Sequence, residues 1–217
     1  MKIFAISDLH MKLELLDNID SDTDLLLIGG DFCNQGNKDE LQTVFKKLLA
    51  LKTLTPELQI AICFGNRDIY AEEYIEEIKA QFPEIHILNN EIKEIKGLKI
   101  YGSPYSMEFM NWGFHYSNSA QCKKLTIPRE EVDIILNHEP VSHRNLSYIS
   151  GGIDIGNEEL LKYIQSSDQK MVVIGGHCHE CGGNMVKIHN SFCFNVSKKG
   201  VYINFIIIYE GIFYFFQ

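Results

Sequence analysis

Short apolar runs alternate with amphipathic stretches through the first half of the chain. Apolar runs of four or five residues predict buried strands at Lys2–Ile6, Leu25–Ile28 and Ile60–Phe64. The stretches between them carry apolar residues three and four positions apart, which is typical of helices packed on a sheet. One of these helices begins at a capping-box pair formed by Asn37 and Glu40. Strands that alternate with helices in this way predict an α/β fold with parallel strands.

The second half of the chain predicts more strands than helices. Glu91–Ile95 and Leu98–Tyr101 are joined by a Lys-Gly dipeptide, a pattern typical of a β-hairpin. A helix is predicted over Glu158–Ile164, whereas the long stretch Ser103–Ile127, which carries Trp112, is predicted to be irregular. The other predicted strands are Ile85–Leu88, Ile134–Leu136, Val172–Ile174, Phe192–Val196, Val201–Tyr209 and Ile212–Phe216.

The order of these elements predicts the layers of the fold. Strand–helix alternation followed by additional strands indicates two mixed β-sheets that pack face to face with helices outside, a four-layer αββα sandwich of the α/β class. With 217 residues, 45% of them hydrophobic, we expect a single domain over residues 1–217. In sheets of this kind, functional sites form beyond the carboxyl ends of the strands.

Polar clusters follow five of the predicted strands, at the point where each strand ends. They are Asp8-Leu9-His10, Gly30-Asp31, Gly65-Asn66-Arg67-Asp68, Asn137-His138 and Gly176-His177-Cys178-His179. Taken alone, the Asp31 and Asn66 clusters are also typical of plain turns, whereas His177-Cys178-His179 is the strongest single signal. Together the five clusters offer carboxylate, amide and imidazole ligands, the mixture that a pair of divalent cations requires. The predicted ligands of this two-metal site are Asp8, His10, Asp31, Asn66, His138, His177 and His179.

Composition and charge narrow the range of partners. The formal net charge of −9 disfavours binding of extended nucleic acid. Two bound cations would nevertheless make the local pocket positive, so a small phosphate ester is the expected substrate. Lys2–Ile6 is expected to be a first strand rather than a secretory signal, and Val201–Tyr209 is too short to cross a membrane. Six cysteines without such a signal predict reduced thiols in a cytoplasmic protein.

The ordered ligand set resembles that of the calcineurin-like metallophosphoesterase superfamily from residue 8 to residue 179. The superfamily fold is an αββα sandwich, in agreement with the prediction above. The residues that the resemblance implies for one ion are Asp8, His10, Asp31 and His179, and those for the other are Asp31, Asn66, His138 and His177, with Asp31 bridging. Manganese, iron and zinc all accept such ligands, and manganese is the ion we favour. Asp68 and Glu180 are candidates to orient the ligand imidazoles.

A narrower likeness extends to about residue 197. The motifs that carry it are Lys99–Pro104, Asn111–Phe114, His179-Glu180 and Asn195–Ser197, which are similar to those of the brain metallophosphoesterase-domain-containing proteins. Relatives of that group are associated with cyclic nucleotide phosphodiesterase activity. We therefore predict a metal-dependent phosphodiesterase in which hydroxide activated by two metal ions attacks a small phosphodiester or cyclic nucleotide in line.

One residue departs from the superfamily pattern. Arg67 stands where most members carry a histidine that protonates the leaving group, and arginine cannot act as a general acid near neutral pH. The same Gly-Asn-Arg-Asp tetrapeptide resembles the diacylglucosamine pyrophosphohydrolases, so pyrophosphate hydrolysis is one alternative and a non-catalytic scaffold is another. The predicted catalytic residues are Asn66, Arg67 and His138, and the predicted phosphate contacts are Arg67 and Arg144. The apolar tail Ile212–Phe216 fits either a dimer contact or the end of a sheet, so no oligomeric state is predicted.

Overall fold

The first sheet has parallel strands at its centre and an antiparallel hairpin at one edge. The computed structural model describes residues 1–208 and 211–216, with side chains through residue 204. Tyr209 and the side chains of the predicted strand Ile212–Phe216 therefore lie outside the described residues. The strands, in spatial order, are β16 (Gly211–Phe216), β15 (Val201–Ile208), β1 (Lys2–Ile6), β2 (Leu25–Gly29), β3 (Gln59–Cys63) and β4 (His86–Ile87). The last four run parallel to one another.

The second sheet has four parallel strands between two antiparallel edges. Its strands, in spatial order, are β13 (Asn184–Ile188), β14 (Ser191–Asn195), β12 (Val172–Gly175), β9 (Ile134–Asn137), β6 (Leu98–Ser103) and β5 (Glu91–Ile95). The β5–β6 hairpin turns at Lys96 and Gly97, both with positive φ, as a tight hairpin turn requires. Both sheets are thus mixed, as predicted.

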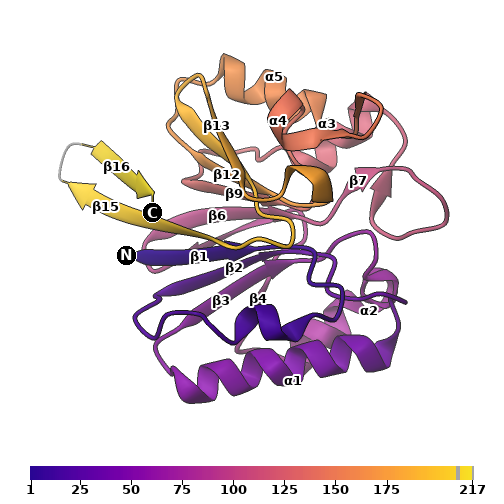
Figure 1. Ribbon diagram of the computed structural model, residues 1–217, viewed down its shortest axis with the longest axis vertical. Coiled ribbons are helices and arrows are strands. Elements are labelled where there is room, and N and C mark those ends of the chain that lie inside the picture. The colour runs from indigo at the N-terminus through magenta and orange to yellow at the C-terminus, as the bar shows by residue number, and fades with distance from the viewer. Residues whose placement is uncertain (209–210, 217) are drawn as a thin grey trace.

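Helices cover the outer face of each sheet, so the molecule has the four layers expected from the sequence (Figure 1). The helices on the side of the first sheet are α1 (Lys38–Leu54) and α2 (Ile69–Gln81), with the short 3-10 turn η1 (Leu13–Leu16) beside them. Those on the side of the second sheet are α3 (Ser119–Thr126), α4 (Arg144–Ser147) and α5 (Glu158–Ser166). The αββα prediction is confirmed.

Alternation along the buried strands explains why these layers form. In β1, Ile3 packs in the core between the two sheets, whereas Phe4 packs in the core under the helices. Successive side chains of a strand point to opposite faces, so a strand buried on both faces is apolar at every position. A third core, which includes Ile135 and Leu160, lies between the second sheet and its helices.

The stretch 103–127 is more ordered than predicted. It contains α3 and the two-residue strands β7 (Ser106–Met107) and β8 (His115–Tyr116). The helix begins at Asn118, whose side chain accepts a hydrogen bond from the backbone N–H of Gln121. Its buried face carries only Cys122 and Thr126, too few apolar residues to give a helical pattern in the sequence.

Several further short elements were not predicted. They are β13, the two-residue strands β10 (Tyr148–Ile149) and β11 (Ile153–Asp154), the helix α4 and the 3-10 turn η2 (His179–Cys181). Four of the five residues of β13 are exposed or half-buried, so that strand lacks an apolar run. Within the described part of the chain, no helix has both the length and the apolar character needed to span a membrane.

Candidate metal centre

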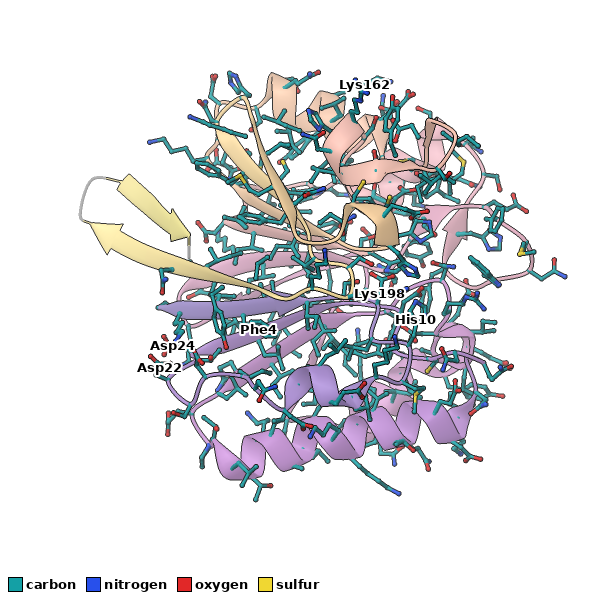
Figure 2. All side chains as sticks on the ribbon, viewed as in Figure 1. Phe4, His10, Asp22, Asp24, Lys162 and Lys198 are labelled. Carbon is teal, nitrogen blue, oxygen red and sulfur yellow. The ribbon has the colours of Figure 1, made fainter. Side chains whose placement is uncertain are left out.

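The five polar clusters meet where the two sheets expose the carboxyl ends of their parallel strands. Figure 2 shows His10 at this edge, close to Lys198. The first sheet supplies Asp8 and His10 after β1, Asp31 after β2 and Asn66 after β3. The second sheet supplies His138 after β9, and His177 and His179 after β12. Residues far apart in the sequence are therefore neighbours because parallel strands end at the same edge.

The backbone turns sharply at the candidate ligands. Four of these residues lie in the left-handed region of backbone conformation, which residues other than glycine rarely adopt. Their φ values are 58° for Asp8, 44° for His10, 52° for Asp31 and 61° for His177. Backbone hydrogen bonds hold two of these turns, from Asp8 N–H to Gly30 O and from His10 N–H to Asp31 O. Such strain costs about 1–3 kcal/mol per residue and is concentrated at functional sites.

The first group of candidate ligands is Asp8, His10 and His179, whose ligand atoms lie within 4.8 Å of one another. The Nε2 atom of His179 lies 3.2 Å from Oδ1 of Asp8 and 3.1 Å from Nε2 of His10. The Nδ1–H of His10 donates to the carbonyl oxygen of Cys33 at 3.1 Å, which leaves the Nε2 lone pair directed at the group.

The second group is Asp8, Asp31 and His138. His138 donates from Nδ1 to the carbonyl oxygen of Gly29 at 2.7 Å, so its Nε2 also carries a lone pair. That Nε2 lies 3.4 Å from Oδ1 of Asp31 and 2.8 Å from Oδ1 of Asn66. Three electron-pair donors thus face one another, an arrangement that a cation between them stabilises.

His177 lies outside both groups in the described part of the chain, although its ring centroid is 5.1 Å from that of His138. Burial and the neighbouring His138 lower the pKa of His177 to about 3, so its imidazole is neutral and able to bind a cation. The structure therefore brings together all seven predicted ligands, with Asp8 shared by both groups. Their roles as ligands remain predictions.

The charges of the cluster are not balanced by protein cations. Asp8 and Asp31 are buried, and among the described residues neither carboxylate lies within 4 Å of a lysine or arginine side-chain nitrogen; their charged-group contacts are with histidines, which carry a charge only when protonated. Burial and the charge of Asp8 raise the pKa of the Asp31 carboxyl well above its usual range. Burial also acts to raise the pKa of Asp8, but the hydrogen bonds with His179 and Ser7 outweigh it, and the net shift is downward. Divalent cations would supply the missing positive charge, so the residues fit a two-metal site.

Two glycines allow the ligand loops to approach closely. A Cβ atom on Gly65 would lie 2.7 Å from Cε1 of His138 and still closer to Oδ1 of Asp31. A Cβ atom on Gly176 would lie 2.5 Å from Oδ2 of Asp8. Only a residue without a side chain fits at these two positions.

Asp68 does not orient a ligand imidazole, contrary to the expectation. Its carboxylate accepts hydrogen bonds from the backbone N–H groups of Phe32, Cys33 and Gly65, at 3.0, 3.0 and 2.9 Å. Burial and the charge of Asp31 raise the pKa of Asp68 to about 7. The residue thus ties together the two loops that carry Asp31 and Asn66.

Two contacts to the candidate ligands were not foreseen. The hydroxyl of Ser7 donates to Oδ2 of Asp8 at 2.7 Å. Lys198 Nζ lies 2.7 Å from Nδ1 of His179. Ser7 adjoins Asp8 in the sequence and was open to prediction. Lys198 reaches the site because Ser197 pairs with Ser7, a contact with no local signal in the sequence.

The two predicted phosphate contacts lie in different surroundings. Arg67 is half-buried at the edge of the cluster, where its backbone N–H donates to Oδ1 of Asp31 at 2.8 Å. Its guanidinium carbon lies 4.0 Å from the ring centroid of Trp112. Arg144 is exposed at the start of α4, and within the described residues no contact joins it to the candidate ligands. A phosphate contact by Arg144 therefore remains a prediction.

A known protein family and several known proteins are similar to this chain. A family profile described as calcineurin-like phosphoesterase matches residues 1–181. Metallophosphoesterase domain-containing protein 1 of Homo sapiens and its namesake in Mus musculus are each 26% identical over 208 residues, covering 85% of this chain and 62% of the relative. The UPF0046 protein C25E10.12 of Caenorhabditis elegans is 28% identical over 203 residues, covering 84% of this chain and 70% of the relative. The chain thus spans about three-fifths of the length of the first two relatives.

Among solved structures, the sulfate thiohydrolase SoxB of Thermus thermophilus in complex with glycerol is similar with a TM-score of 0.47 and 11% identity, covering 88% of this chain and 38% of that chain. The family profile is the informative match, because residues 1–181 include every strand end that carries a candidate ligand. The αββα layers and the converging carboxylates and imidazoles agree with it. The chain therefore belongs to the calcineurin-like phosphoesterase family.

Proposed function

We propose that this chain is a phosphodiesterase that uses two divalent cations, with manganese as the favoured metal. Family membership and the candidate ligands support a metal-dependent phosphoesterase. When bound, two cations activate the attacking water and neutralise charge that develops on the phosphate. The observation that carries the preference for a diester is Arg67, which is fixed beside the cluster by Asp31 and Trp112.

Arginine at this position limits the leaving groups that the site can use. Its guanidinium stays charged throughout a reaction, so Arg67 can hold a phosphoryl oxygen but cannot give the leaving oxygen a proton. Substrates whose leaving group departs without protonation fit best, such as an activated diester or a pyrophosphate. A cyclic diester also fits, because release of ring strain offsets part of the cost of expelling an alkoxide. Phosphorylated serine or threonine fits poorly because its alkoxide needs a proton.

His138 and Asn66 complete the inner face of the proposed site. His138 is buried, and its bond to the Gly29 carbonyl keeps Nε2 directed toward Asp31 and Asn66. The Nδ2 atom of Asn66 is buried and has no hydrogen-bond partner within the described residues. A buried amide N–H without a partner is costly, so a substrate oxygen that accepts from it would bind more tightly.

A substrate screen tests the proposal. The manganese-supplemented chain would be assayed with bis-p-nitrophenyl phosphate, p-nitrophenyl phosphate and a nucleoside diphosphate ester. We expect the diester to be hydrolysed fastest and His138→Ala to lower kcat about hundredfold or more, since lost support of a metal ligand alone costs about 10–100-fold. His86→Ala is the control, because His86 is half-buried beside Gln59, at the opposite end of β3 from the cluster.

The outcomes separate the candidate functions. Fastest hydrolysis of the nucleoside diphosphate ester would replace the proposal with a pyrophosphohydrolase. A metal-loaded chain that hydrolyses none of the three compounds would contradict the proposal and favour a scaffold role. Unfolding curves of both variants would show whether a loss of activity reflects a loss of fold.

A further inference from the structure

The segment Met107–Gly113, called here the apolar loop, exposes hydrophobic side chains beside the candidate metal centre. Met107, Phe109 and Met110 are 55%, 59% and 67% exposed. The one charged side chain of the loop, Glu108, accepts a hydrogen bond from the hydroxyl of Ser117 at 2.8 Å. A cluster of exposed apolar side chains is unfavourable in water and indicates a binding surface.

Hydrogen bonds at its two ends hold the apolar loop against the candidate site. At one end, the backbone N–H of Met107 donates to Oε1 of Glu139, the residue after His138, at 2.9 Å. At the other end, the N–H of Gly113 donates to the carbonyl oxygen of Asn66 at 3.0 Å. Because Asn66 follows the first sheet and His138 the second, the loop spans both walls of the site. Neither bond uses the exposed side chains.

Two aromatic side chains of the apolar loop, Phe109 and Trp112, connect it to Arg67, the proposed phosphate contact. Arg67 lies over the ring of Trp112 with 4.0 Å between its Cζ atom and the ring centroid. Phe109 meets the same indole edge-on, with centroids 5.2 Å apart and planes at 68°. A phosphate held by Arg67 would therefore place the groups esterified to it next to Phe109.

We propose that the apolar loop binds an aromatic ring carried by the phosphate ester, with Phe109 as the stacking surface and Trp112 as the residue that positions Arg67. This inference rests on the proposed function. Planar rings gain from stacking on aromatic side chains, and an exposed phenyl ring such as that of Phe109 offers such a face.

A lipid surface is a weaker candidate for the same loop. Segments that insert into membranes combine apolar residues with lysine or arginine, which anionic headgroups attract. Residues 105–118 contain no lysine or arginine, and the chain has a formal net charge of −9. The charge of the loop and of the chain therefore favours a small substrate with a neutral ring over an anionic membrane.

Fluorescence tests the inference without any need for turnover, because Trp112 is the only tryptophan of the chain. We expect thymidine 5′-monophosphate to change the emission of Trp112 at lower concentration than methyl phosphate does. Phe109→Ala should weaken this response about tenfold, the scale of one base–aromatic stack. Leu54→Ala is the control, since Leu54 is 82% exposed at the far end of α1.

Kinetics provide a second arm with one leaving group. Thymidine 5′-p-nitrophenyl phosphate and methyl p-nitrophenyl phosphate both release nitrophenolate, so the ratio of their kcat/KM values isolates recognition of the nucleoside. We expect Phe109→Ala to lower this ratio about tenfold, Phe109→Trp to preserve it and Phe109→Leu to fail to restore it. Leu54→Ala should leave the ratio at the wild-type value.

Each result supports or overturns the inference. If neither ester is hydrolysed, the proposed function fails and the fluorescence response alone decides the inference. Hydrolysis with a ratio that Phe109→Ala does not change would overturn the inference while the phosphodiesterase proposal stands. Full rescue by Phe109→Leu, or an emission change with phosphatidylcholine vesicles and none with thymidine 5′-monophosphate, would also overturn it.

Discussion

Among the residues of the site, Arg67 restricts the choice of leaving group most directly. Because arginine cannot protonate a leaving oxygen, the rate should depend steeply on leaving-group acidity. With a series of aryl methyl phosphates, we expect a steep fall in kcat as the pKa of the phenol rises. Arg67→His supplies a titratable group at the same place and should make the dependence shallower. A shallow dependence in the wild type would contradict the role given to Arg67.

Gly65 provides a test of close packing between the ligand loops. In Gly65→Ala the new Cβ would clash with Oδ1 of Asp31 and lie 2.7 Å from Cε1 of His138. We expect the free energy of unfolding to fall by about 1–3 kcal/mol and manganese affinity to fall with it. Urea unfolding and manganese titration measure the two effects.

Gly97→Ala is the control for Gly65→Ala. A Cβ at Gly97 meets nothing within 4 Å, so only the positive φ of 78° is penalised. We expect a cost of about 1–2 kcal/mol in stability and unchanged manganese affinity. Equal metal affinity in both variants would show that close packing at Gly65 does not shape the site.

The sequence was most informative about the candidate ligands and least informative about what holds them. Asp8, Asp31 and His138 could be predicted to converge, because each follows an apolar run that ends at the same edge of a sheet. The contact of Lys198 with His179 and the hydrogen bonds of Asp68 could not, since they depend on side-chain directions that residue spacing does not specify.

At the scale of elements, the largely buried carboxylate of Glu159 joins α3 to α5. Glu159 of α5 accepts a hydrogen bond from Ser119 of α3 at 3.0 Å and pairs with Lys162 at 2.8 Å and with Lys123 at 3.0 Å. The hydrogen bonds with Lys162 and Lys123 lower the pKa of Glu159 to about 2. A lowered carboxyl pKa stabilises the folded state above the usual value of 4.5, and this stabilisation is lost as the pH falls toward 2.

Glu159→Gln should therefore unfold more readily than the wild type at pH 7 and lose less stability between pH 5 and pH 2. Glu158→Gln is the matched control, because the neighbouring Glu158 has a side chain that is 75% exposed and lies 4.0 Å from Lys162. Thermal unfolding followed by circular dichroism across this pH range measures the difference. Identical pH profiles for the two variants would contradict the role of Glu159 in joining the helices.

Elements with strong apolar patterns were predictable, and those held by polar contacts were not. The central strands of both sheets were predicted within one or two residues, because burial on both faces leaves almost no polar positions. The helix α3 was missed because it has no apolar stripe. A hydrogen bond from the Asn118 cap begins it, and its buried Thr126 is held by a hydrogen bond to the carbonyl oxygen of Cys122. Local capping is visible in the sequence only when a periodic pattern follows it.

At the scale of the whole molecule, the candidate metal centre joins two separate sheets. Asp8, Asp31 and Asn66 extend from one sheet, and His138, His177 and His179 from the other. The layers could be predicted from element order, but the position of β15 beside β1 could not, since this pairing joins the two ends of the chain. Cations that bind only the folded arrangement would stabilise it by about 2.7 kcal/mol at a hundredfold excess over Kd.

Metal stoichiometry tests the central claim most directly. The metal-free chain would be titrated with manganese and the bound ions per chain counted, alongside His179→Ala and the control His189→Ala, two histidines whose side chains are 37% and 42% exposed. We predict two ions for the wild type and for His189→Ala, and fewer than two for His179→Ala. A wild-type chain that binds no manganese, zinc or iron, or a His179→Ala variant that binds two ions with wild-type affinity, would contradict the account.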